Sequence, residues 1–67
     1  MNAMTPAAYG TFDRICKAVT GRGKGITLQE IGDAHALARE LEKEEPDPER
    51  VALFTGRLNV DLEEIGP

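Results

Sequence analysis

The chain has 67 residues and a formal net charge of −4 at pH 7, and 40% of its residues are hydrophobic. This length suits one small domain, residues 1–67, whose core supplies only about 3–5 kcal/mol without a staple or a partner. Cys16 is the single cysteine, which excludes an internal disulfide, and no ligand spacing predicts a metal or another cofactor. No signal-peptide pattern or apolar run of roughly 20 residues occurs, so we expect a cytoplasmic protein.

The first predicted helix covers residues 6–20. Thr5 followed by Pro6 is typical of an N-cap and a first helical position, because a proline there lacks an N–H that the first turn cannot use. Apolar side chains then recur at helical spacing, at Ala8, Phe12, Ile15, Cys16 and Val19. This face should point into a core.

The second predicted helix covers residues 28–44. Thr27 and Glu30 form the pattern of a capping box, in which each side chain accepts the backbone N–H of the other residue. The apolar face that follows contains Leu28, Ile31, Ala34, Leu37, Ala38 and Leu41, with Glu40 on the polar half. Pro46 disfavours helical geometry at the residue before it, which places the end of the helix near Glu44.

The third predicted helix begins after Asp47 at Pro48, and two alternatives remain for its end. In one, it ends at residue 58, Asn59 closes it, and a short helix covers residues 62–65. The string VDLEEIG at 60–66 favours this break, because it repeats the order of ITLQEIG at 26–32. In the other, the helix is continuous and an apolar stripe of Leu53, Gly56 and Val60 stays exposed, which predicts a homodimer or a bound partner.

No stretch alternates with a period of two, as a half-buried strand would. The fold prediction is therefore all-α, a small bundle of three main helices with a short C-terminal fourth.

Charge is unevenly distributed along the chain. Residues 1–25 carry four basic side chains and one acidic side chain (net +3), whereas residues 26–67 carry four basic and eleven acidic ones (net −7). The acidic side chains concentrate where the second predicted helix meets the third, at Glu40, Glu42, Glu44, Glu45, Asp47 and Glu49. Such a run is commonly a solvated corner, but it can also dock a basic protein surface.

The basic side chains of the N-terminal third offer a different binding site. Arg14, Lys17, Arg22 and Lys24 lie in or before the glycine-rich segment 21–25, next to a predicted helix start whose N–H groups attract anions. A nucleotide-binding phosphate loop needs a preceding strand and a Ser or Thr after the lysine, and this segment has neither. A flexible linker is the simpler interpretation.

Residues 26–42 loosely resemble the opening of the helix-turn-helix, a DNA-binding motif. The segment 33–36 lacks the glycine of a turn, and the would-be recognition segment is acidic and would be repelled by phosphates. Neither His35 nor Cys16 has a partner in the sequence that would make it a catalytic base or nucleophile.

These patterns lead to one hypothesis and one alternative. We expect a non-enzymatic interaction module, an acidic helical adaptor or inhibitor, which binds a partner protein with a basic surface through the acidic corner. Small acidic proteins of this type, some of them encoded by phages, suggest this by analogy. The alternative is a small DNA-binding transcriptional regulator that uses the basic N-terminal third and the GRGKG loop. An enzyme is not expected, since no set of acid, base and nucleophile is visible.

Overall fold

The computed structural model describes residues 4–21 and 23–66, and in that part of the chain every regular element is a helix. The helices are α1 (Pro6–Thr20), α2 (Leu28–Leu41), α3 (Pro48–Leu58) and the short α4 (Leu62–Ile65). The predicted all-α fold with three main helices and a short fourth is therefore confirmed. Arg22 lies outside the described residues.

Side chains at the helix starts bind the free backbone N–H groups there, as the sequence predicts. The Thr5 hydroxyl accepts the Ala8 N–H at 3.1 Å, in front of a proline at the first position of α1. At the start of α2 the capping box is complete, with the Glu30 N–H 3.1 Å from the Thr27 hydroxyl and the Thr27 N–H 2.9 Å from Glu30 Oε1. These bonds fix both starts by satisfying donors that the helix itself leaves unpaired.

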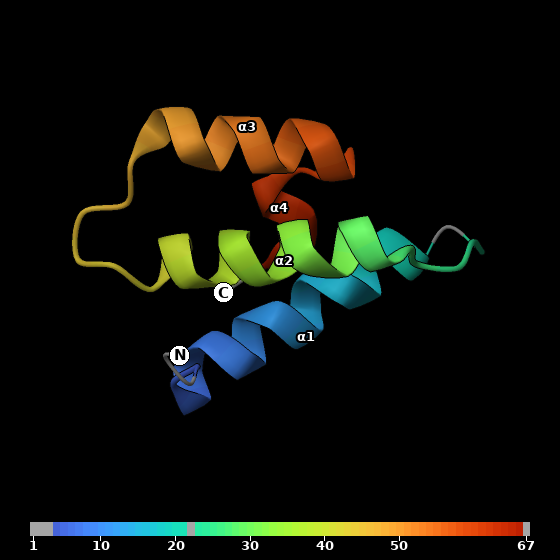
Figure 1. Cartoon of the computed structure of the whole chain (residues 1–67), viewed down its shortest axis with the longest axis horizontal. Coiled ribbons are helices and arrows are strands. Elements are labelled where there is room, and N and C mark those ends of the chain that lie inside the picture. The colour runs from blue at the N-terminus through green and yellow to red at the C-terminus, as the bar shows by residue number, and fades with distance from the viewer. Residues whose placement is uncertain (1–3, 22, 67) are drawn as a thin grey trace.

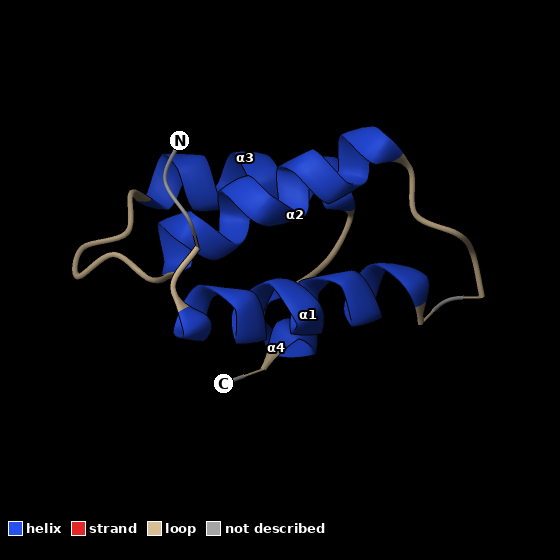
Figure 2. Cartoon of the chain, turned by 60° about the horizontal axis from the view of Figure 1, so that its bottom comes forward, coloured by secondary structure: helices blue, strands red, loops and turns tan. Residues whose placement is uncertain are grey.

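Helix α2 lies at the centre of the molecule. It packs against α1 on one side and α3 on the other, and α4 packs against α1 (Figures 1 and 2). Helices α2 and α3 run antiparallel. Arg57 near the end of α3 accordingly pairs with Asp33 near the start of α2, with Nε 3.0 Å from Oδ2. The connection between α2 and α3 therefore lies at one end of this helix pair (Figure 1).

The core lies where the three longer helices and α4 meet. Its largest fully buried side chains are Ile15, Leu37, Leu58 and Val19. Ile65 of α4 is also buried, and Phe12, Cys16, Val51 and Phe54 pack partly buried around this cluster. The predicted inward face of α1 is thus confirmed.

The predicted apolar face of α2 is only partly buried. Ala34, Leu37 and Ala38 are in the core, whereas Leu28 is 87% exposed and Ile31 is 37% exposed. Helical periodicity assigns a residue to a face, but it does not show how much of that face the neighbouring helices cover. The prediction that both residues point into the core was wrong.

The chain breaks between α3 and α4, as the first alternative predicts. Asn59 adopts the left-handed conformation (φ 56°, ψ 47°), and the Val60 N–H donates to the Thr55 carbonyl at 3.1 Å. Asparagine tolerates this conformation better than most residues, so it closes α3. Val60 then turns into the core, where it is 5% exposed.

Helix α2 ends at Leu41 and not near Glu44 as predicted. Its last turn gives way to a non-helical connection because the Asp47 N–H donates to Glu40 at 2.9 Å, which requires the chain to fold back.

Within the described residues, no helix is long and apolar enough to cross a membrane.

Candidate protein-binding surface

Glu40 anchors the connection between α2 and α3. One carboxylate oxygen accepts from Lys43 Nζ and from Arg50 Nε, both at 3.1 Å, and the other accepts from the Asp47 N–H at 2.9 Å. The bond from Asp47, followed by that from Lys43, lowers the pKa of Glu40 below its usual range. This carboxylate therefore stays ionised at neutral pH and binds two residues of the connection, Lys43 and Asp47, and one residue of α3, Arg50.

Glu40 is not part of an exposed acidic surface, although the sequence places it there. Its side chain is only 3% exposed. The helical wheel puts Glu40 on the polar half of α2, but a wheel ignores the chain that folds back over that half after the helix ends. Glu40 is therefore a structural residue and not available to a partner.

The other predicted acidic residues are exposed. Glu42 faces α1, where it accepts the Thr11 hydroxyl at 3.0 Å. The remaining carboxylates lie on the connection itself and at the start of α3, and we call them the acidic connection: Glu44, Glu45, Asp47 and Glu49. None of them forms an ion pair with a residue in the described ranges, although Asp47 caps α3 by accepting the Glu49 N–H at 2.9 Å. No direct ion pair with a described residue thus neutralises these four carboxylates.

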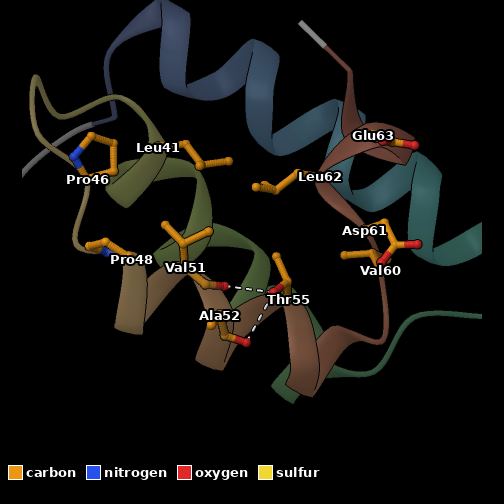
Figure 3. Close-up of a pocket in the computed structure, with 10 residues that line it drawn as sticks. All are labelled: Leu41, Pro46, Pro48, Val51, Ala52, Thr55, Val60, Asp61, Leu62 and Glu63. Carbon is orange, nitrogen blue, oxygen red and sulfur yellow. Dashed lines mark hydrogen bonds between the residues drawn. The ribbon is translucent and has the colours of Figure 1, made fainter.

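An open groove with a volume of about 820 Å³ lies beside the acidic connection, between α3 and the segment that enters α4 (Figure 3). We call it the α3–α4 groove. Its apolar lining consists of Leu41, Pro46, Pro48, Val51, Ala52, Val60 and Leu62. In Figure 3, Leu41 and Leu62 point toward each other from opposite sides, above Val51 and Thr55. Ligand pockets in proteins typically hold about 300–1,000 Å³, so this groove is large enough to bind one.

The polar groups that line the α3–α4 groove are few. The Thr55 hydroxyl lies 2.9 Å from the Val51 carbonyl and 3.1 Å from the Ala52 carbonyl, so its proton is used within α3. The other polar side chains of the lining are Asp61 and Glu63, and both are exposed. The charged side chains in the described part of the lining are therefore all negative.

The predicted anion site before α2 is occupied by a carboxylate of the chain itself. Lys24 Nζ lies 2.6 Å from Glu30 Oε2, and the other oxygen of Glu30 accepts the Thr27 N–H. The Lys24 ammonium and the Thr27 N–H lower the pKa of Glu30, so this carboxylate is charged at neutral pH. A phosphate at this helix start would have to displace it.

Two of the other predicted nucleic-acid contacts also have partners. Lys17 Nζ lies 2.9 Å from the Asp13 carboxylate, one helical turn away. Arg14 Nη2 donates to the Thr11 hydroxyl at 3.1 Å, close to the Glu42 carboxylate that the same hydroxyl binds. Much of the positive charge of α1 is therefore balanced locally.

The helix-turn-helix alternative lacks its turn. Residues 33–36, where the motif needs one, lie within the continuous helix α2.

The apolar stripe of Leu53, Gly56 and Val60, which predicted a homodimer, is split. Val60 is buried, whereas Leu53 and Gly56 are exposed on α3. The physical reason is the turn at Asn59, which rotates Val60 away from the other two residues.

Cys16 and His35 are placed as residues at the edge of the core. The His35 ring packs edge-on against Phe12, with ring centroids 6.0 Å apart. Burial raises the pKa of the Cys16 thiol, and the negative charge of Asp13 raises it by a smaller amount. In the part of the chain that the structure describes, no three His, Cys, Asp or Glu side chains are grouped as metal ligands.

Sequence reasoning missed Asp61, Glu63 and Leu62 as parts of a surface. The available signal was the short string VDLEEIG, whose acidic residues lie far along the chain from Glu44 and Glu45. The break at Asn59 brings them to the other end of the α3–α4 groove.

Comparisons of the chain with known protein families, curated proteins and solved structures gave no significant match.

Proposed function

We propose that this protein is a non-enzymatic interaction module, an acidic adaptor or inhibitor that binds a partner protein with a basic surface. The observation that carries the proposal is the position of the unpaired carboxylates. The acidic connection lies at one end of an apolar groove, and Asp61 and Glu63 lie at the other. Exposed charge of one sign beside apolar surface suits a complementary protein surface, and it speeds the encounter with that surface.

The ion pairs elsewhere in the molecule support this site over others. Lys17, Lys24 and Arg57 each pair with a carboxylate outside the acidic connection. Lys43 and Arg50 are close to the acidic connection, yet both bind the buried Glu40. Among the described residues, the carboxylates that form no ion pair therefore include the acidic connection and, at the start of α4, Asp61 and Glu63.

The test uses a 16-residue oligolysine peptide as the probe, titrated into the labelled protein and followed by amide NMR shifts. Shifts should concentrate at residues 42–49 and 61–63 and weaken as salt rises, because exposed ion pairs are screened. Glu44→Gln with Glu45→Gln should weaken binding roughly fivefold, since each exposed pair contributes about 0.2–1 kcal/mol.

A control with the same change in net charge makes this result specific. Gln29→Lys with Gly32→Lys also raises the net charge by two units, at exposed positions of α2 distant from the acidic connection. If both variants weaken binding equally, only net charge matters and the proposed site is wrong. Tighter binding of a 16-base-pair DNA duplex than of oligolysine, with shifts at Lys17 and Lys24, would favour the DNA-binding alternative instead.

A further inference from the structure

We propose that the α3–α4 groove binds the apolar face of a short basic amphipathic helix of the partner protein. This inference rests on the proposed function and names the element that is recognised. The apolar residues of that helix would occupy the groove, and its lysine and arginine side chains would meet the carboxylates at the two ends.

The groove has the length of a short helical ligand. Its wall on α3 extends from Pro48 to Thr55, seven residues along the helix. At 1.5 Å per residue this is about 10 Å, or about two helical turns. Two turns of an amphipathic helix present apolar side chains at positions i, i+3, i+4 and i+7, which is the usual pattern of helices bound in grooves.

The chemistry of the groove selects apolar side chains in its middle. Leu41, Val51, Ala52 and Leu62 offer no hydrogen-bonding side chain, and the Thr55 hydroxyl is bound to its own helix. A polar ligand group placed there would lose its water without gaining a hydrogen-bond partner, which weakens binding. Leu62 is 50% exposed, so a ligand gains by covering it.

The chemistry at the two ends selects positive charge. Asp61 and Glu63 line the groove at the start of α4, and Glu45 and Asp47 are the chain neighbours of Pro46 and Pro48 at the opposite end. Among the residues that the structure describes, no lysine or arginine lines the groove. A ligand with cations on both sides of an apolar centre therefore matches the groove along its whole length.

A helical ligand fits better than an extended strand or a second copy of this chain. Extended peptides bind mainly through backbone hydrogen bonds to a sheet edge, and the described residues contain no strand. A second copy would bring more negative charge next to the carboxylates at the two ends of the groove. Three of its cations, Lys17, Lys24 and Arg57, already have carboxylate partners. Charge repulsion therefore disfavours self-association at this groove.

The experiment is a selection of random 16-residue peptides displayed on phage against the immobilised protein. We expect enriched peptides with large apolar residues at helical spacing, interleaved with lysine or arginine. Their affinity should fall about tenfold or more for Leu62→Ser, as expected for an apolar contact at the centre of an interface. Leu28→Ser is the matched control, because Leu28 is an exposed leucine at the corresponding position of ITLQEIG and lies outside the groove.

A second pair of variants tests the groove without removing an apolar side chain from α4. Ala52→Gln places a longer neutral side chain in the groove, whereas Leu53→Gln changes the next exposed position of α3, outside it. Circular dichroism should show the same helix content for all four variants. Ala52→Gln should weaken peptide binding about as much as Leu62→Ser does, and Leu53→Gln should leave it within twofold.

The other outcomes separate this inference from the proposed function. Basic peptides without helical spacing, or binding that Leu62→Ser does not weaken, would overturn the helix-in-groove inference and leave the proposed function standing. Enrichment of neutral or acidic peptides would overturn the proposed function. Absence of any enriched peptide, or a dimer in sedimentation that Leu62→Ser dissociates, would overturn the inference.

Discussion

The strings ITLQEIG (26–32) and VDLEEIG (60–66) begin helices in the same way but lie in different surroundings. Each has a capping residue followed three positions later by a glutamate that accepts the N–H of the capping residue, at 2.9 Å from Thr27 and 3.1 Å from Asp61. In the first string Ile31 is 37% exposed, whereas the corresponding Ile65 of the second is 4% exposed. Local sequence thus determines where a helix begins, and the neighbouring helices determine which of its residues are buried.

The largest expected difference between the two strings is in stability. Ile65→Ala removes buried methyl and methylene groups and should cost about 2–5 kcal/mol, which approaches the whole stability of a domain this small. Ile31→Ala should cost less than about 1 kcal/mol, because its side chain is already partly in water. Urea denaturation followed by circular dichroism measures both values, and equal losses would show that exposure does not distinguish the two positions.

A smaller effect is expected at Asn59, just before the second string. Asn59→Ala keeps a Cβ in the left-handed conformation but removes the side-chain amide that makes this conformation accessible to asparagine, so it should destabilise the protein by about 1 kcal/mol. Asn59→Gly should remain within about 0.5 kcal/mol of the native protein, because glycine adopts this conformation readily. The comparison of the two variants in urea isolates the backbone effect, and similar midpoints for alanine and glycine would contradict the role given to this turn.

The smallest expected effect is the pH dependence at the first string. Lys24 and the Thr27 N–H lower the pKa of Glu30, so Glu30 stabilises the fold above its unfolded pKa, and this stabilisation is lost as the pH falls through its folded pKa. Glu30→Gln should therefore lower the thermal midpoint at pH 7 and reduce the further fall on going to about pH 3. Glu44→Gln is the control for the loss of one negative charge. The role of Glu30 is contradicted if both variants follow the same curve.

Much of the fold could be predicted because its signals are local. Thr5, Thr27, Asp47 and Asn59 each bind or orient backbone groups within a few residues, so the helix starts and the break before α4 can be found from sequence. The end of α2 could not, because it depends on the Asp47 N–H reaching Glu40 seven residues away. The preference against helix before Pro46 indicated an end, but three residues too late.

The candidate surface was less accessible to sequence reasoning. The acidic run correctly indicated Glu44, Glu45, Asp47 and Glu49 as exposed carboxylates. It could not separate them from Glu40, because charge along a sequence does not reveal which side chain the chain folds over. The α3–α4 groove depends on the packing of α4 and thus on contacts between distant residues.

The bonds to Glu40 have a consequence for any partner of the acidic connection. Lys43, Asp47 and Arg50 are held by one carboxylate in the free protein, so this segment already has its shape before an encounter. Association then loses less conformational entropy than it would with a loosely structured loop. The affinity for such a partner should therefore depend on Glu40, a buried side chain that the ligand never touches.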